Sequence, residues 1–342
     1  MRNFRRFGWL LTYLFGASPA VCKSFVRNRE HNLDSFDEST AYLPNATSLR
    51  SGSLGYQSDA QSHQINICYN SLYDYVKSLA EAIVKPYPPY ELISKNSPEA
   101  YPQLSSNILQ SEAEFYSSIR AKRVPAKGQN FLHSLRDDGV QYIEVRLLDV
   151  NPYLPLGIDE SEISFIDTFL TYCLGIDSPS HNDILCQEVT WNTQATVRDG
   201  RAMDIMLTNN GVPVSLNQWS NEIINDVMQV AELLDEKAGT TTHVDSVKAQ
   251  QVKLNDASDT PSGKILSDMR SGNLSFYEFA MQKSIEHRAH FGEPELSTDR
   301  LDYHQQLAAA SLNDQLDIEE ADTGSFDDYL RQLADQYTEL LN

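Results

Sequence analysis

The residues best suited to chemistry lie in one stretch, "QYIEVRLLDVNPY", at positions 141–153. Side chains alternate across a β-strand, so Glu144 and Arg146 are expected to share a face about 7 Å apart. The apolar side chains should form the opposite, core-facing side: Ile143, Val145 and Leu147. A carboxylate beside a guanidinium can hold a metal ion and bind an anion next to it. The alternative is that these two residues form a weak ion pair on an exposed strand face. The pattern alone favours this alternative.

Two further groups of cationic residues could bind anions. In "FYSSIRAKRV", Arg120 and Lys122 share one strand face and Arg123 follows. The planar guanidinium of arginine suits phosphates and carboxylates, although basic strand ends are also common on plain surfaces. In "ATSLRSGSLGY", Arg50 and Tyr56 lie in a glycine-containing loop. Such a loop is compatible with ligand binding without being specific to it.

The opening stretch, "MRNFRRFGWLLTYLFGASPAVC", allows two interpretations. Three early arginines, a short apolar run and small residues behind it resemble a secretory signal peptide. The alternative is a buried helix over residues 7–15 that ends at Gly16, with Pro19 preventing its resumption. The run is far shorter than the roughly 20 apolar residues of a membrane-spanning helix.

The elements that must position these residues follow from periodicity and breakers. A helix is predicted from the capping residue Ser71 to Pro86, with an apolar stripe. Strands are predicted over 113–124 and 139–150. Helices should dominate from Ser161 onward, and a last helix should begin at Ser325 and bury five apolar side chains. The remaining expectations are a loop over 28–64, a connection over 86–104, and these apolar faces: Leu72, Val76, Leu79 and Ile83; Ile163, Ile166, Phe169, Leu170 and Cys173; Ile223, Ile224, Val227, Ala231 and Leu234; Phe326, Tyr329, Leu330, Leu333 and Tyr337.

Composition narrows the function classes. The 342 residues are 41% hydrophobic, which suffices for a packed core. The net charge of −21 argues against nonspecific nucleic-acid binding. Residues 1–150 are nearly balanced, with 16 basic and 15 acidic residues, so the acidic surface belongs to the second part. The four cysteines form no CxxC pair, which indicates reduced thiols in a cytoplasmic protein. No Walker A, GxGxxG, GxSxG or HExxH pattern is present.

Four blocks resemble glutamate–cysteine ligases of the bacterial glutamine-synthetase-like type, in the family's order and spacing. They are "RFGWLLTYLFGASPAVC", "YLPNATSLR" with "LGY", "NILQSEAEFYSSIRAKR" and "YIEVRLLDVNP". A weaker likeness continues to "EEADTGSFDDYL". The resemblance implies an α+β fold, with part of an antiparallel glutamine-synthetase-like sheet over residues 1–156 and a mainly helical, acidic region over 157–342. It also implies a core helix at the chain start and therefore a cytoplasmic location.

The family's reaction gives the candidate residues their implied roles. ATP phosphorylates the gamma-carboxylate of L-glutamate, and the amine of L-cysteine attacks the acyl phosphate, with Mg²⁺ or Mn²⁺ required. Glu144 matches a metal ligand, and Arg146 matches a residue that contacts the substrate carboxylate or the transferred phosphate. The cysteine pocket is matched by Arg50, Tyr56 and Tyr116. Arg120 and Arg123 are implied phosphate or nucleotide contacts.

The resemblance also carries expectations about the chain as a whole. The family has a segment before the first matched block that holds most acidic metal ligands, so this chain is expected to be a C-terminal portion that is inactive alone. Full-length members are expected to be monomers that act on small molecules and bind neither nucleic acid nor membranes. The alternatives are a non-catalytic truncated paralogue with a binding or structural role, and an exported protein with a cleaved signal. Departures from the family pattern fit a divergent member: Asn45, Ser53, Ala113, Ser118 and Ala121.

Overall fold

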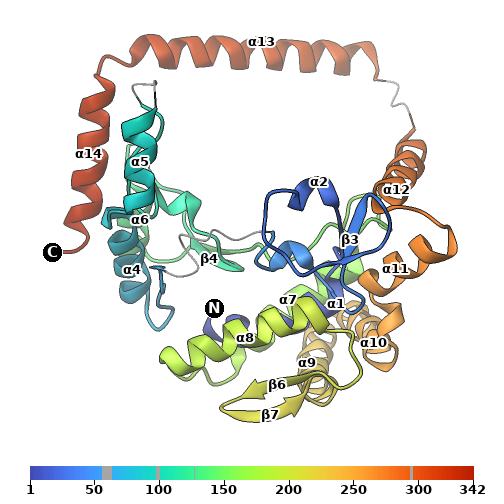
Figure 1. Ribbon diagram of the computed structural model, residues 1–342. Coiled ribbons are helices and arrows are strands. Elements are labelled where there is room, and N and C mark those ends of the chain that lie inside the picture. Colours follow the sequence, from blue (N-terminus) through green and yellow to red (C-terminus); the bar gives the residue numbers. More distant parts are fainter. Residues whose placement is uncertain (56–63, 98–100, 127, 293–295) are drawn as a thin grey trace.

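The computed structural model describes residues 1–55, 64–97, 101–126, 128–292 and 296–342 (Figure 1). Tyr56, one of the candidate pocket residues, lies outside these ranges. All strand pairs within the described ranges are antiparallel, and they form one three-stranded and two two-stranded sheets. Helices make up most of the rest, so the α+β class is confirmed.

The opening stretch is a core helix, α1 (Arg2–Phe15). Eleven of its fourteen residues are buried, and Trp9, Leu10 and Leu14 are at most 1% exposed. The helix ends at Gly16, whose N–H donates to the carbonyl of Thr12. A Cβ at Gly16 would lie 2.5 Å from that carbonyl oxygen, so a larger residue would force the chain apart here. The predicted helix over 7–15 is therefore confirmed and begins one turn earlier.

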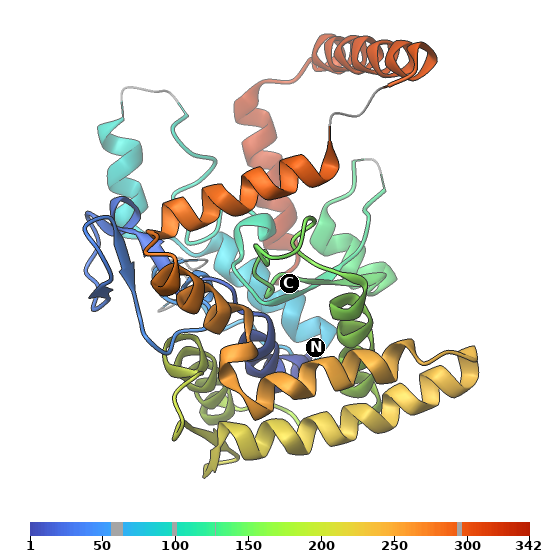
Figure 2. The same ribbon diagram turned by 90° about the vertical axis from the view of Figure 1, so that its right-hand side faces the viewer.

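The main core forms where α1 packs on the helices of the second half of the chain. It contains α7 (Glu160–Gly175), α8 (Asp183–Asp199), α9 (Leu216–Ala238) and α10 (Thr242–Asn255). Figure 2 shows α9 and α10 side by side along one edge of the molecule. The aromatic side chains of α1 interlock with those of α7 and α9: Phe4 with Phe169, Phe15 with Phe165, and Trp9 with Trp219. One core thus contains residues from both sides of position 156. The predicted boundary between two regions at this position stays a prediction.

A second core surrounds α4 (Leu72–Val84), which packs on α6 (Phe131–Asp138) and α14 (Phe326–Glu339). Ser71 caps α4 by accepting from the N–H of Asp74, and Val76, Leu79 and Ile83 are buried as predicted. The last helix does begin after Ser325, but Phe326 and Tyr329 are exposed and only its C-terminal end is buried. The predicted connection over 86–104 was wrong in part, because Pro88 and Pro89 start a helix, α5 (Pro88–Asn96), at positions where proline is tolerated.

The two predicted strands form a short ladder, β4 (Ile119–Lys122) with β5 (Tyr142–Val145), which lies between the two cores. On the face expected to be apolar, Leu147 is buried, Val145 is partly buried and Ile143 is 38% exposed. Along α7, Ile163 is also exposed, and Phe165 and Tyr172 take the core positions instead. The remaining elements are β1 (Ala20–Cys22), α2 (Lys23–Val26), β2 (Asp34–Ser35), β3 (Thr40–Tyr42), η1 (Leu49–Ser51), η2 (Glu112–Glu114), β6 (Met206–Asn209), β7 (Val212–Ser215), η3 (Ala257–Asp259), α11 (Pro261–Ser271) and α12 (Phe276–Phe291).

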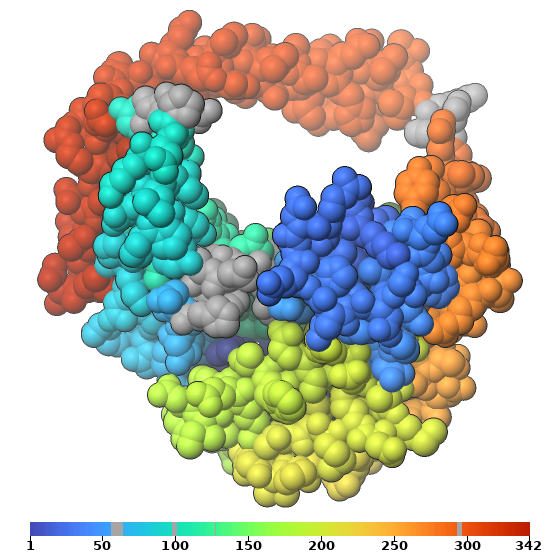
Figure 3. Space-filling view, viewed as in Figure 1, coloured from blue at the N-terminus to red at the C-terminus, as the bar shows by residue number. Residues whose placement is uncertain are grey.

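The helix α13 (Thr298–Ala321) stands apart from the rest of the molecule and bridges α12 and α14 (Figures 1 and 3). Its 24 residues span about 36 Å, and none of them is buried. No helix in the described ranges is both long enough and apolar enough to cross a membrane.

Candidate functional site

The β4–β5 ladder brings the predicted acidic and basic residues together. Arg120 pairs with Glu144 in the ladder register, and Lys122 pairs with Tyr142. The carboxylate of Glu144 lies between two cations, since its Oε2 is 3.9 Å from Nζ of Lys122 and its Oε1 is 3.9 Å from Nε of Arg146. Glu144 and Arg146 therefore share a face, as strand alternation predicts.

The Oε2 atom of Glu144 is buried and has no hydrogen-bond partner among the described residues. The ammonium of Lys122 compensates its charge in part from 3.9 Å, but this distance is too long for a hydrogen bond. A bound cation would satisfy this atom, so the geometry fits one ligand position of a metal ion. Within the described part of the chain, however, no three His, Cys, Asp or Glu side chains are grouped to hold a metal. Glu144 could supply one ligand, and the described residues do not complete the set.

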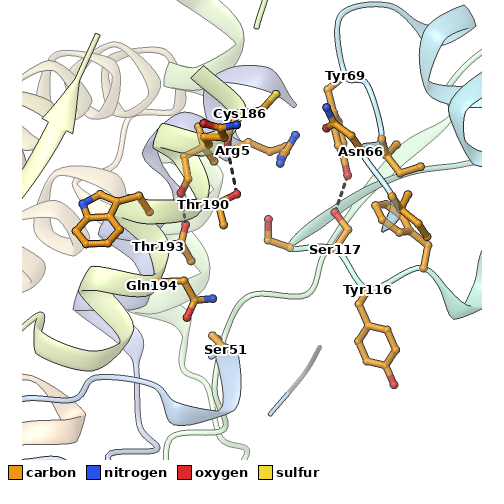
Figure 4. Close-up of a pocket in the computed structure, with 18 of the residues that line it drawn as sticks. Arg5, Ser51, Asn66, Tyr69, Tyr116, Ser117, Cys186, Thr190, Thr193 and Gln194 are labelled. Atoms are coloured by element: carbon orange, nitrogen blue, oxygen red, sulfur yellow. Dashed lines mark hydrogen bonds between the residues drawn. The ribbon is translucent and has the colours of Figure 1, made fainter. Parts of the chain in front are cut away.

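Arg146 follows directly after β5, and its N–H donates to the carbonyl of Ser118 across the ladder. Its side chain lines a cavity of about 880 Å³ together with Tyr116, Ser117 and Leu147. The other walls come from α1, from α8, from Ser51 and from residues 64–69 (Figure 4). Segments far apart in the sequence thus meet around one hollow, which is large enough for a small-molecule ligand.

A second cation faces this cavity from α1. Arg5 lies 4.5 Å from the centre of the Tyr69 ring and lines the cavity wall opposite Tyr116 (Figure 4). Tyr69 is held by hydrogen bonds to Ser117 and to the carbonyl of Ile119. The lining thus contains two arginines, Arg5 and Arg146, and one acidic residue, Asp183. This balance makes the cavity suited to an anionic ligand.

Arg50 lies beside the cavity and is oriented by Asp149. Its Nη1 is 3.4 Å from Oδ1 of Asp149, and its guanidinium also donates to the carbonyls of Arg146 and Leu147. The next residue, Ser51, lines the cavity. Arg50 therefore ties the "ATSLR" loop to the chain segment that carries Arg146.

Asp149 is the organising residue that the sequence reasoning missed. Its side chain is 3% exposed and accepts from the N–H of Ala17 at 2.8 Å and from the hydroxyls of Ser18 at 2.7 Å and Ser48 at 3.0 Å. It thereby joins the end of α1, the Arg50 loop and the β5 extension. An acidic residue directly after an apolar strand was the available signal, but residue type alone does not show which donors it meets.

The other two arginines make structural contacts instead of lining the cavity. Arg120 is 6% exposed and donates to the carbonyls of Ala113 and Phe115. Arg123 donates to the carbonyls of Asp138 and Gly139, at the C-terminal end of α6, where a cation complements the helix dipole. Of the sequence-predicted residues, the structure brings together Glu144, Arg146 and Tyr116, with Arg50 beside them.

Comparison with known proteins identifies the class to which this fold and site belong. The family model described as glutamate–cysteine ligase matches residues 1–196, which include Arg50, Tyr116, Glu144 and Arg146. The chain belongs to the glutamate–cysteine ligase family. It is 44% identical over 327 residues to glutamate–cysteine ligase of Pseudomonas putida, and 44% identical over 330 residues to that of Pseudomonas aeruginosa.

These alignments cover 96% of this chain and 62% of each relative, so the chain spans less than two thirds of the length of the curated relatives it matches. The crystal structure of Francisella tularensis glutamate–cysteine ligase in complex with AMP superimposes with a TM-score of 0.90 at 30% identity, and covers 99% of this chain and 67% of that one. A bifunctional glutathione synthetase from Pasteurella multocida shares the fold, with a TM-score of 0.59 at 20% identity over 84% of this chain and 31% of that one.

Proposed function

We propose that the cavity beside Glu144 and Arg146 is part of a site for ATP-dependent ligation of L-glutamate to L-cysteine, the first step of glutathione biosynthesis. The observation that carries the proposal is the pairing of Glu144 with Arg146, which itself lines the cavity, inside the segment that the family model matches. In the reaction, ATP transfers its gamma-phosphoryl group to the gamma-carboxylate of glutamate. The cysteine amine then attacks the acyl phosphate and inorganic phosphate leaves.

The family's reaction suggests a task for each residue. Arg146, with five N–H donors in a fixed fork, would bind the substrate carboxylate or the phosphoryl oxygens as charge develops on them. Glu144 would supply one ligand to Mg²⁺ or Mn²⁺, an ion that neutralises phosphate charge when bound. Tyr116 and Arg50 would bind cysteine, with Asp149 holding Arg50 in place, and Tyr56 is assigned to the same pocket from its family position alone.

ATP as the co-substrate is supported by the AMP bound to the Francisella tularensis relative. We infer that Arg120 and Arg123 can contact the nucleotide only if they give up the hydrogen bonds that they now donate to backbone carbonyls. In their present positions they stabilise the segment that leads to Tyr116 and the end of α6. A cytoplasmic location and a monomeric state also remain proposals.

A second candidate function is a non-catalytic binding or structural role. It is favoured by one observation, the lack of a group of three metal-binding side chains in the described ranges. Phosphoryl transfer needs several carboxylates to hold metal ions beside ATP, and magnesium binds weakly to one carboxylate.

The test is phosphate release by the purified chain that depends on ATP, L-glutamate and L-cysteine together. Such turnover should fall about a hundredfold or more in Glu144→Gln and in Arg146→Lys, because both interactions act on the transition state. The exposed Glu232→Gln on α9 is the matched control and should keep wild-type turnover. The chain could instead show no turnover but bind AMP, with weaker binding in Arg146→Lys. That result would support a nucleotide site that needs further metal ligands. Absence of both turnover and AMP binding in calorimetry would overturn the proposal and favour the non-catalytic role.

A further inference from the structure

Two of the four cysteines, Cys68 and Cys186, lie where residues 64–70 meet the start of α8, beside the cavity. Hydrogen bonds join the two segments on both sides of Cys68. Before it, Nδ2 of Asn66 donates to Oδ1 of Asp183 at 3.4 Å. After it, Asn70 exchanges two hydrogen bonds of 2.8 Å with the backbone of His181. Cys68 is thus held against residues 181–183.

Cys186 lies three residues beyond Asp183, on the same face of α8, because residues three apart on a helix are neighbours. It lines the cavity, as do Ile67 and Tyr69 on either side of Cys68. In Figure 4 the side chain of Cys186 extends toward the side of the cavity on which Asn66 and Tyr69 lie. Both residues are partly exposed free cysteines.

The surroundings of the two sulfur atoms differ from those of the other cysteines. Burial raises the pKa of the Cys186 thiol, while the nearby Arg5 guanidinium, which also hydrogen-bonds to the sulfur, opposes this shift, and Cys68 adds to it. The Sγ of Cys68 accepts from the N–H of Asn70 at 3.5 Å. Cys173, by contrast, is buried in the main core, and burial raises the pKa of its thiol to about 12.

We propose that Cys68 and Cys186 form a reversible disulfide by exchange with a small-molecule disulfide, which makes the cavity wall a redox modification site. One protein thiolate attacks a sulfur of the small disulfide, whose S–S bond breaks and releases a first thiolate. The second protein thiolate then attacks the mixed disulfide at the protein sulfur and releases a second thiolate. The two protons lost by the cysteines are taken up by the two released thiolates. The protein is oxidised by two electrons, and the small disulfide is reduced to two thiols.

The new bond would cross-link residues 64–70 to α8, which are two walls of the same cavity. A disulfide brings the Cα atoms of its two residues to about 4.4–6.8 Å, so this wall would be fixed while the bond exists. Tyr69, on which Arg5 lies, would be held with it. The site goes beyond the proposed ligase function and does not depend on it, since the thiol chemistry can be measured without turnover.

The test is to incubate the folded protein with glutathione disulfide, block the remaining thiols and map peptides without reduction. The expected product lacks two of the four thiols and contains one cross-linked peptide pair that joins Cys68 to Cys186. Adding dithiothreitol should restore all four thiols. Cys22→Ser is the matched control, because Cys22 lies on β1 away from this wall, and this variant should form the same cross-link.

In Cys186→Ser the cross-link should be lost, and Cys68 should instead carry glutathione as a stable mixed disulfide. Circular dichroism checks that each variant is folded. Four free thiols after incubation would overturn the proposal. So would stable mixed disulfides on both Cys68 and Cys186 in the wild type, or a cross-link that forms only in urea.

Discussion

Replacement of Asp149 by asparagine tests whether this buried carboxylate organises the site. The change keeps the size of the side chain but turns one of its two oxygens into an NH₂ group. Oδ2 accepts from Ala17 and Ser18, and Oδ1 accepts from Ser48 and Arg50. Whichever way the amide is oriented, its NH₂ group faces one group that can only donate, either the N–H of Ala17 or the guanidinium of Arg50, and one serine hydroxyl that would have to turn round to accept. At least one hydrogen bond to a charged acceptor is therefore lost.

The expected cost follows from these contacts. A hydrogen bond to a charged group contributes about 1.5–3 kcal/mol, and a buried donor left without a partner costs about 1–3 kcal/mol. We expect the Asp149→Asn substitution to lower the free energy of unfolding by about 3 kcal/mol, which is roughly a hundredfold in the folding equilibrium constant. The loss should be insensitive to salt because the side chain of Asp149 is only 3% exposed.

Urea unfolding followed by tryptophan fluorescence measures this effect. Trp9 and Trp219 lie 4.8 Å apart in the main core and report its loss directly. Asp204→Asn is the matched control, since Asp204 is exposed, and its midpoint should equal that of the wild type. If Asp149→Asn also unfolded at the wild-type midpoint, Asp149 would not hold the three segments together, and the argument for Arg50 would fall with it.

Two further predictions concern stability. Gly16→Ala should lower the free energy of unfolding by about 1–3 kcal/mol, because the new Cβ would lie 2.5 Å from the carbonyl oxygen of Thr12. Gly175→Ala is the control, since no atom lies within 4 Å of its Cβ position, and it should be neutral or stabilising. Equal urea midpoints for the two variants would refute this reasoning. Burial lowers the pKa of Lys253 to about 8, so the folded state releases this proton before the unfolded state does, and stability should rise with pH above about 8 by at most about 1.4 kcal/mol per pH unit. Urea unfolding at pH 8 and pH 9.5 measures the rise in the free energy of unfolding. The wild type and the exposed control Lys248→Met should show the full rise, and Lys253→Met should show less of it. An equal rise in all three proteins would contradict the prediction.

Local sequence patterns predicted some helices and strands correctly and others not. The apolar run of α1 and the Ser71 cap of α4 predict those helices correctly, because capping and amphipathicity depend on neighbours in the chain. The strand predictions placed both strands but made them too long, since a strand extends only as far as its partner pairs with it. The helix α5 is not evident from local pattern, because its two prolines usually end a helix but here occupy the first turn, where their missing N–H groups have no partner to lose.

The candidate site, too, could be predicted from the sequence only in part. Alternation along one strand was enough to place Glu144 and Arg146 on a common face, because side-chain direction in a strand is set by the backbone of that strand alone. The sequence could also connect the blocks to a family through their order and spacing.

Only the tertiary structure decided which cations face the cavity. Arg120 and Arg123 read as ligand-binding residues in the sequence, yet they are oriented by backbone carbonyls of other segments. Arg5, part of an apparent signal sequence, faces the cavity instead. The reason is physical: a buried guanidinium must find acceptors, and which carbonyls lie within reach depends on how distant parts of the chain pack together.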